Sequence, residues 1–192
     1  MASDKDRIRS EVRKRRDNFV KERLSCSEFA ANLPAPLERL VQSSNIVAGY
    51  VRLGSEIDPS NLIDAAAQLG RTIALPCLRA RADDLGFRKW QPGEPMEQAD
   101  FGFLQPLPSA EACAPDLILT PLVGFDRALN RLGQGAGYYD RAFAARPDSL
   151  RIGIAWSIQE CDGLMTDPWD MPLDAVLTEK EWITAPHSRI GA

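Results

Sequence analysis

The sequence contains few of the side chains on which many nucleophilic and metal sites depend. Its 192 residues include one histidine, His187, close to the C-terminus, and its four cysteines form no CxxC pair. A zinc site would therefore lack ligands, and a cysteine or serine nucleophile would lack a histidine base. The thiols are expected to have no chemical role. The chemistry has to depend on carboxylates, basic side chains, backbone N–H groups or a bound cation.

Long apolar runs are also absent. No stretch approaches the ~20 apolar residues that span a bilayer, and the charged N-terminus lacks the apolar segment of a secretion signal. We therefore expect a cytoplasmic protein with no membrane partner. The chain is 44% hydrophobic and 26% charged, with a net charge of −4, which is typical of a globular protein. Its length predicts one domain over residues 1–192, and we expect a monomer.

Residues 1–23 are basic, with nine Lys or Arg against five Asp or Glu. At helical spacing in this segment lie the apolar residues Ile8, Val12, Phe19 and Val20. This pattern predicts an amphipathic helix with one narrow apolar stripe. A basic arm can bind nucleic acid, but the remainder of the chain is acidic, so we expect a docked helix and no nucleic-acid partner. Lys5 and Arg9 are four residues apart and share a face of this helix.

Further along the chain, short apolar runs alternate with helical segments. The predicted strands cover residues 45–53, 72–76, 85–90, 117–122, 150–156 and 174–178. The predicted helices cover residues 35–42, 59–69 and 138–146. Asp58 is expected to cap the second helix and Pro59 to be its first residue. Strand–helix–strand units imply a parallel sheet. We predict an α/β fold, a three-layer sandwich whose mostly parallel sheet of five or six strands has helices on both faces.

Residues 91–115 are rich in Pro and Gly and show neither helical nor strand periodicity. A long irregular segment within a domain usually has a function or is mobile. Phe101 and Phe103 lie within it. They either anchor the segment to the core or stack on a flat ligand.

Carboxylates occupy two further informative positions. Glu56 follows the first predicted strand, where open α/β sheets place their ligands, but it is equally consistent with a surface residue near a helix start. Asp167, Asp170 and Asp174 lie close together near the end of the chain. They are either solvated turn residues or a metal ligand with its neighbours.

The most informative stretch is 116–141, DLILTPLVGFDRALNRLGQGAGYYDR. A buried strand precedes a loop in which Gly133, Gly135 and Gly137 alternate, and a helix follows. Glycines let backbone N–H groups turn inward, and with the helix N-terminus they predict an anion site. The spacing matches neither a Walker A loop nor the GxGxxG dinucleotide pattern. Alternatively, the glycines only satisfy the geometry of a tight strand-to-helix turn.

Charged side chains in this stretch favour a phosphate ligand. Arg131 can contact a phosphate through two nitrogens. Asp126 and Asp140 would repel that phosphate unless a cation lay between them. Mg²⁺ bound with a nucleotide is the simplest way to hold both kinds of group together.

Two segments resemble the 5-formyltetrahydrofolate cyclo-ligase family, also called methenyltetrahydrofolate synthetases. They are VGFDRALNRLGQGAGYYDR (123–141) and DPWDMPLDAVLTE (167–179), and weaker agreement extends over almost the whole chain. The resemblance implies a Rossmann-like fold and an enzyme that uses Mg²⁺ and ATP to convert 5-formyltetrahydrofolate into 5,10-methenyltetrahydrofolate, ADP and phosphate. The formyl oxygen would attack the γ-phosphate, after which N10 closes the ring and phosphate departs. Catalysis would then consist of positioning and charge neutralisation.

The resemblance also implies residue roles. The ATP-binding residues would be Lys5, Arg9, Arg131, Gly133, Gly135, Gly137, Tyr138 and Tyr139. The residues facing the folate would be Val51, Glu56, Phe101, Gln134, Gly135, Ala136, Gly137 and Tyr138, with Glu56 bonded to the pterin ring and Phe101 stacked against the folate. Asp140 and Asp170 would hold Mg²⁺. Arg131, Gln134 and Tyr138 would be the catalytic residues.

Three positions depart from the family pattern. Ala136 replaces a lysine found in some members, Leu129 and Asn130 replace a Gly-x pair, and Trp169 replaces a common histidine. The first departure leaves room for a related ATP-binding protein that acts on a different substrate. The sequence is also compatible with a nucleic-acid binder and with an α/β domain whose glycines are purely structural.

Overall fold

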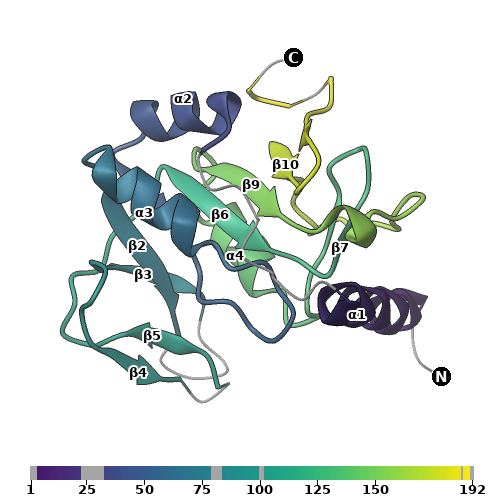
Figure 1. Cartoon of the computed structure of the whole chain (residues 1–192), viewed down its shortest axis with the longest axis horizontal. Helices are drawn as coiled ribbons and strands as arrows, with labels where there is room; N and C mark the ends of the chain where they lie inside the picture. Colours follow the sequence, from purple (N-terminus) through teal and green to yellow (C-terminus); the bar gives the residue numbers. More distant parts are fainter. Residues whose placement is uncertain (1–3, 23–32, 79–83, 100–101, 187, 191–192) are drawn as a thin grey trace.

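The structure, a computed structural model, describes residues 4–22, 33–78, 84–99, 102–186 and 188–190, and its centre is a seven-stranded sheet (Figure 1). The strands lie in the order β11-β10-β9-β6-β1-β2-β3. They are β1 (Ile46–Ala48), β2 (Thr72–Cys77), β3 (Gly86–Lys89), β6 (Leu117–Pro121), β9 (Leu150–Ile154), β10 (Ala175–Leu177) and β11 (Trp182–Ile183). The inner strands are parallel, and the edge strands β3 and β11 are antiparallel to their neighbours. The mostly parallel α/β sheet is confirmed. Strand β11 was not predicted, because two residues are too few to show a period.

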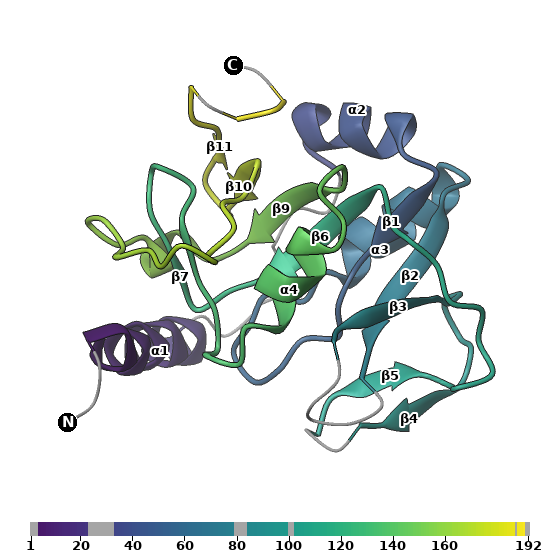
Figure 2. The same ribbon diagram turned by 180° about the vertical axis from the view of Figure 1, so that it is seen from behind.

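Helices cover both faces of this sheet (Figures 1 and 2). On one face lie α2 (Ala35–Ser43) and α3 (Ser60–Gln68), and on the other lies α4 (Tyr138–Ala144). Each face has its own core of buried side chains. Leu117 and Leu119 of β6 pack in the core beneath α2 and α3, whereas Ile118 packs with Phe143 of α4 in the other. This alternation is what a strand buried on both faces requires. The predicted three-layer arrangement is therefore confirmed.

The N-terminal helix α1 (Asp4–Glu22) lies at the carboxyl ends of the parallel strands. It packs against η2 (Ser157–Gln159), the 3-10 helix after β9, and the ring centroids of Phe19 and Trp156 are 5.6 Å apart. Val12 packs with Val123 and Leu132 beyond the end of β6. The predicted apolar stripe therefore docks the helix where open sheets bind ligands. None of the helices in the described ranges combines the length and hydrophobicity needed to cross a membrane.

The segment 91–115 contains two strands, so the expectation of a wholly irregular segment was wrong. β4 (Met96–Gln98) and β5 (Leu104–Pro106) pair antiparallel in a small sheet of their own. Gln105 attaches this pair to the core, since its Oε1 accepts a bond from the Leu78 N–H and its Nε2 donates to Glu97, both at 2.9 Å. Because each strand has three residues and the anchor is polar, hydropathy does not reveal them. Phe101 lies outside the described residues.

Two of the element boundaries that differ from those predicted affect the region around Glu56. α3 begins at Ser60, with Pro59 as its N-cap, and Asp58 accepts a bond from the Ser60 N–H at 3.0 Å. The expected cap pair is therefore displaced by one residue. β1 ends at Ala48, because beyond the Gly49 N–H, which still donates to Ala74, the chain leaves the sheet. The loop formed in this way carries Glu56.

Candidate functional site

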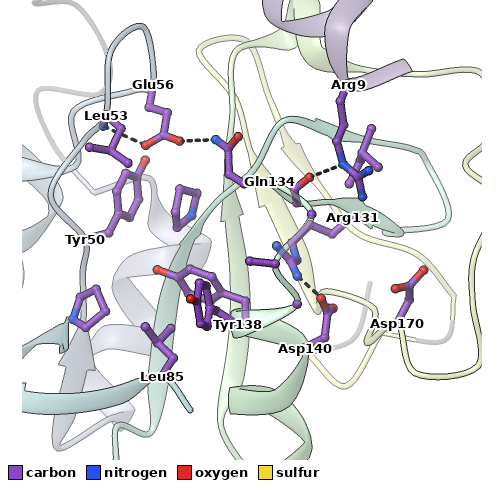
Figure 3. A pocket seen from close by; sticks show the side chains of 18 of the residues that line it. Arg9, Tyr50, Leu53, Glu56, Leu85, Arg131, Gln134, Tyr138, Asp140 and Asp170 are labelled. Carbon is purple, nitrogen blue, oxygen red and sulfur yellow. Dashed lines mark hydrogen bonds and ion pairs between the residues drawn. The ribbon is translucent and has the colours of Figure 1, made fainter. Parts of the chain in front are cut away.

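A cavity of about 440 Å³ opens where the parallel strands end (Figure 3). Tyr50, Pro76 and Pro121, which lie at or just beyond the ends of β1, β2 and β6, line its floor. Its two ends differ in character. Apolar side chains such as Leu85 lie toward one end, and charged side chains such as Asp170 lie toward the other (Figure 3). The position agrees with the rule that open α/β sheets bind ligands at the carboxyl ends of their strands.

Almost all predicted site residues line this one cavity. They are Lys5, Arg9, Val51, Glu56, Arg131, Gly133, Gln134, Gly135, Ala136, Gly137, Tyr138, Tyr139, Asp140 and Asp170. There are two exceptions: Phe101 lies outside the described residues, and Asp126 does not line the cavity. Phe103 both lines the cavity and packs against the core, so the two interpretations of Phe103 are compatible. The fold thus brings together side chains from α1, the β1–α3 loop, the glycine loop and the 167–170 turn. Their individual roles remain predictions.

The glycine loop connects a small two-stranded sheet, β7 (Gly124–Phe125) with β8 (Arg131–Leu132), to α4. Gly135 and Gly137 have φ angles of +106° and +67°, which residues with a Cβ rarely adopt. Gly133 is required for another reason, since a Cβ there would lie 2.7 Å from Nη1 of Arg131. The glycines therefore serve both the local turn geometry and the close approach of Arg131.

Arg131 is a buried guanidinium at the charged end of the cavity. Its side chain is 4% exposed, and Nη2 donates to Oδ1 of Asp140 at 2.9 Å. The guanidinium carbon lies 5.6 Å from the ring centroid of Tyr139 and 5.7 Å from that of Phe143. Nε is buried and has no hydrogen-bond partner among the described residues. Leaving a buried charged donor unpaired costs free energy, and the side chain that carries this donor lines the cavity.

Lys5 and Arg9 reach the same end of the cavity from α1. Nζ of Lys5 lies 2.6 Å from carboxylate oxygens of both Asp167 and Asp170. Burial lowers the pKa of Lys5, but the hydrogen bonds and charges of these two carboxylates outweigh it and leave the pKa raised. Arg9 donates from Nε to the Gly133 carbonyl at 2.9 Å. The ammonium of Lys5 therefore stays charged beside the 167–170 turn, and Arg9 lies beside the glycine loop.

Asp140 and Asp170 are the predicted magnesium ligands. Oδ1 of Asp140 accepts bonds from Arg131 and, at 3.4 Å, from the Met171 N–H, which places the residue after Asp170 against Asp140. Burial raises the pKa of Asp170, but the Asp167 N–H and Lys5 outweigh this effect, so the pKa is lowered and the carboxylate is charged. Carboxylate oxygens suit Mg²⁺, which usually takes one or two of them together with substrate phosphates. The donors therefore fit the ion, although the described residues contain no cluster of three or more metal-ligating side chains.

Glu56 lies beside the apolar end of the cavity and is 6% exposed. Its Oε2 accepts a bond from the Leu53 N–H at 2.9 Å, and its Oε1 accepts one from Nε2 of Gln134 at 3.1 Å (Figure 3). Burial raises the pKa of the carboxyl, and these bonds together with the charge of Arg16 oppose the rise. Of the two interpretations left open by the sequence, the surface residue is excluded, and a ligand-binding role for Glu56 stays a prediction. Burial is the main cause of the raised pKa, so a glutamate exposed on the surface would not show it.

Asp126 was expected beside the phosphate site, and this was wrong. It is 4% exposed, does not line the cavity, and organises a turn by accepting bonds from the N–H groups of Ala128, Asn130 and Leu164. Leu129, at a position where the family pattern has glycine, adopts a φ of +65° while fully buried. The turn is therefore retained despite the substitution, and the bonds to Asp126 hold it.

Two polar side chains at the site, Tyr50 and Arg13, were not predicted from the sequence. Tyr50 lines the cavity floor and donates from its hydroxyl to the Ile57 carbonyl at 2.9 Å. Arg13 of α1 donates from Nη2 to Oε1 of Gln134 at 2.5 Å. Arg13 lies four residues after Arg9 on the same helical face, a spacing that would have identified it. Nothing in the local pattern distinguishes Tyr50 from an ordinary strand residue.

Comparison with known proteins gives a consistent result. A family model described as the 5-formyltetrahydrofolate cyclo-ligase family matches residues 1–179. A Haemophilus influenzae protein named 5-formyltetrahydrofolate cyclo-ligase is 32% identical over 90% of this chain and 96% of its own length. A Mycolicibacterium smegmatis protein with the same name is 34% identical over 78% of this chain and 81% of its own.

Solved structures agree at the level of the fold. The solution structure of Aquifex aeolicus 5,10-methenyltetrahydrofolate synthetase has a TM-score of 0.72 and 27% identity, covering 94% of this chain and 92% of that one. A Mycoplasma pneumoniae 5,10-methenyltetrahydrofolate synthetase has a TM-score of 0.66 at 23% identity, covering 92% and 99%. The likeness therefore extends over almost the full length of each chain.

Proposed function

The chain belongs to the 5-formyltetrahydrofolate cyclo-ligase family, and from this membership we propose that it is a ligase that converts 5-formyltetrahydrofolate into 5,10-methenyltetrahydrofolate with consumption of ATP. One observation carries the proposal. The cavity combines a cationic end, where a buried arginine has an N–H unpaired within the described residues, with an apolar end that contains a buried carboxylate. The first end suits a triphosphate, and the second suits a flat heterocycle with N–H donors.

The chemistry requires two substrates in one cavity. The formyl oxygen attacks the γ-phosphorus and ADP leaves, so that this oxygen becomes part of a phosphate leaving group. N10 then attacks the formyl carbon, the C–O bond breaks, and inorganic phosphate departs as N10 loses its proton. No side-chain nucleophile is needed. The protein supplies proximity and charge complementarity.

At the cationic end, Arg131 is the principal phosphate contact. Its stacking on Tyr139 and Phe143 and its bond to Asp140 hold the guanidinium in one orientation before the ligand arrives. A preorganised cation stabilises the charge that develops during phosphoryl transfer without reorganisation. Arg9, fixed on the Gly133 carbonyl, adds a second positive charge. When Mg²⁺ is bound by Asp140 and Asp170, it would neutralise the phosphate oxygens at this point.

At the apolar end, Glu56 is the group expected to select the folate. Each of its oxygens already accepts one protein hydrogen bond, from Leu53 or from Gln134, and each retains a second acceptor site. The N–H groups of a pterin are donors that can occupy those sites. Because the carboxylate is buried, leaving these sites empty is costly, which discriminates against substrates without such donors.

The test is a direct assay with purified protein, 5-formyltetrahydrofolate, ATP and Mg²⁺, which follows the near-ultraviolet absorbance of the methenyl product. We expect an increase that requires both ATP and Mg²⁺ and that Glu56→Gln strongly reduces. Glu160→Gln, a substitution at a glutamate that does not line the cavity, is the matched control. If folded protein binds ATP but forms no product, the substrate assignment is wrong, and a related ATP-binding protein with another substrate is favoured.

A further inference from the structure

Trp169 is the most exposed large hydrophobic side chain in the described part of the protein, at 68%. It also lines the cavity. Exposing an indole to water is unfavourable, and an isolated exposed residue needs no explanation unless it borders a binding site. Trp169 meets that condition. Met165, on the same segment, is 58% exposed but does not line the cavity. Exposure of an apolar side chain on this segment therefore does not by itself place it in the cavity.

A tight turn presents the indole. The Asp170 N–H donates to the Asp167 carbonyl at 3.0 Å, and the Asp167 N–H donates back to Oδ2 of Asp170 at 2.8 Å. Pro168 precedes Trp169 within the turn, where a proline ring restricts φ to a value suited to this position. Lys5 then joins both carboxylates to α1 at 2.6 Å. Hydrogen bonds within the turn and the ion pairs with Lys5 together hold its backbone. They therefore fix the position of Trp169 at the tip of the turn.

The location of this turn relative to the two ends of the cavity matters most. In Figure 3, Tyr50, Glu56 and Leu85 lie on one side, Asp170 lies on the opposite side, and Arg131 lies between them. With the folate at the Glu56 end and the phosphates at Arg131, the remainder of a nucleotide has to extend away from Glu56. This direction leads toward the turn that carries Asp170 and Trp169.

We propose that the indole of Trp169 is the platform on which the base of the bound nucleotide stacks. The inference rests on the proposed function, because it assumes that the triphosphate occupies the Arg131 end. Stacking on an indole contributes affinity for any base, since every base has an aromatic face, and large bases gain most. The site is therefore expected to prefer purine over pyrimidine nucleotides while discriminating weakly between adenine and guanine.

The test compares ATP with inorganic tripolyphosphate, which carries the phosphates but no base. Binding is measured by calorimetry with wild type, Trp169→Ala, Trp169→Phe and the control Met165→Ala. We expect Trp169→Ala to weaken ATP binding about tenfold, the usual scale of one base stack, and Trp169→Phe to weaken it about threefold or less. Tripolyphosphate binding should stay within about twofold of wild type in all variants. ATP, but not tripolyphosphate, should quench a component of tryptophan fluorescence that is absent from Trp169→Phe.

Each other outcome has a distinct meaning. Unchanged ATP affinity in Trp169→Ala would overturn the platform and leave the proposed function intact. An equal loss of ATP and tripolyphosphate affinity would also overturn it, because Trp169 would then act through Asp170 and Lys5. Failure of wild-type protein to bind either compound would refute the phosphate site, and with it both the proposed function and this inference. The substituted residue is exposed, so the variants are expected to fold.

Discussion

Arg13 donates from Nη2 to Oε1 of Gln134 at 2.5 Å, and this bond determines which way the Gln134 amide faces. An arginine has donors only, so Gln134 has to offer Arg13 its oxygen. The amide nitrogen then points to Oε1 of Glu56, 3.1 Å away. Oε1 of Glu56 can accept this bond when the carboxyl group is ionised, or when its proton is on the other oxygen. Arg13 therefore acts on the Glu56 end of the cavity through one intervening side chain.

Replacing Arg13 should affect substrate binding more than turnover. In Arg13→Met the Gln134 amide is free to rotate, and we expect KM for 5-formyltetrahydrofolate to rise about fivefold, the scale of one partly exposed charged hydrogen bond, with kcat little changed. Arg13→Lys, which restores a donor, should recover much of the loss. Steady-state kinetics give both constants. Arg7→Met is the control, because Arg7 pairs with Glu11 on the exposed side of α1. A fall in kcat as large as the rise in KM would contradict a positioning role.

Glu56 should make the enzyme less stable as the pH rises. Its pKa in the folded protein is raised above 4.5, chiefly by burial, so between 4.5 and that higher value the folded state binds more protons than the unfolded state. The contribution of Glu56 to the free energy of unfolding therefore decreases as pH rises through this window, and the loss is complete above it. In Glu56→Gln that pH-dependent loss is absent. The stability of Glu56→Gln relative to wild type should increase from pH 4.5 toward neutrality.

Chemical denaturation of both proteins at several pH values measures this difference, and the sign of its slope is decisive. A constant difference, or one that moves in favour of wild type, would show that Glu56 has no raised pKa. The same substitution should weaken folate binding about tenfold to a hundredfold, since it removes a buried charged acceptor. The residue that makes the protein less stable at neutral pH is thus the one expected to select its substrate.

The parts of the site that follow regular patterns were predictable from the sequence. The apolar run at 117–122 and the alternating glycines at 133, 135 and 137 predicted a strand and a ligand loop; the structure has the strand and a loop of that shape. A parallel sheet places its ligands at the carboxyl ends of its strands, which directed attention to Glu56, and Glu56 lines the cavity. These predictions depend on backbone periodicity and topology, and a single sequence contains both.

Contacts between distant side chains were not predictable in the same way. Lys5 meets Asp170 across 165 positions, and no local pattern links the two. The prediction for Asp126 was wrong because a carboxylate near a glycine loop gives the same sequence pattern in two cases. It can face a ligand, or, as in this structure, it can accept hydrogen bonds from the N–H groups of its own turn. Gln105 was missed because its role in attaching β5 depends on a polar side chain meeting the end of β2. Tertiary packing decides each of these cases.

Asp140 should show opposite effects on ATP binding with and without Mg²⁺. Without the ion, its negative charge opposes the phosphates, so Asp140→Asn should bind ATP as well as wild type or better. With the ion, the variant loses a ligand and should bind ATP about tenfold more weakly, with product formation largely lost. Calorimetric titration with ATP, in chelator and in Mg²⁺, tests both halves. Asp167→Asn is the control, because Asp167 shares Lys5 with Asp170 but is not a proposed ligand.

A weaker affinity of Asp140→Asn under both conditions would indicate that Asp140 acts only by holding Arg131. The two side chains are 16% and 4% exposed and 2.9 Å apart, so some loss of stability is expected in any case. An asparagine at position 140 keeps the oxygen that accepts from Nη2 of Arg131 but carries no charge. We therefore expect the free energy of unfolding to fall by about 2 kcal/mol. This loss does not depend on Mg²⁺, which separates it from the effect on ATP.

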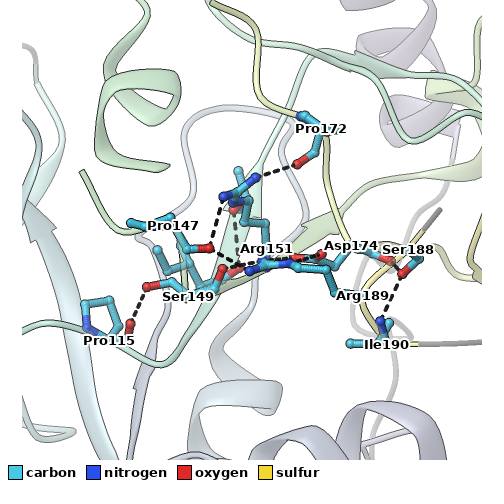
Figure 4. A network of polar contacts seen from close by, with 11 residues as sticks. Pro115, Pro147, Ser149, Arg151, Pro172, Asp174, Ser188, Arg189 and Ile190 are labelled. Carbon is cyan, nitrogen blue, oxygen red and sulfur yellow. Dashed lines mark hydrogen bonds and ion pairs between the residues drawn. The ribbon is translucent and has the colours of Figure 1, made fainter. Parts of the chain in front are cut away.

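Two surface arginines, of which Arg189 has one ion pair and Arg127 has two, should differ in their effect on stability. Arg189 donates to both oxygens of Asp174, at 2.7 Å and 2.5 Å, and to the carbonyls of Pro147 and Ser149 (Figure 4). Asp174 is 4% exposed, so without Arg189 its buried carboxylate would lose the one salt bridge that it makes among the described residues. We expect Arg189→Ala to lower the free energy of unfolding by about 2 kcal/mol.

Arg127 is the matched comparison. It forms bonds of 2.7–3.0 Å with Glu160 and Glu181, but its own side chain is 55% exposed and those of its partners are 33% and 45% exposed. Water solvates all three groups once the pair is broken, so Arg127→Ala should cost less than about 1 kcal/mol. Urea denaturation of the two variants gives the comparison directly. A larger loss in Arg127→Ala than in Arg189→Ala would mean that the number of ion pairs, and not the burial of the carboxylate left behind, determines the cost. Neither variant should alter ATP affinity, because neither side chain lines the cavity.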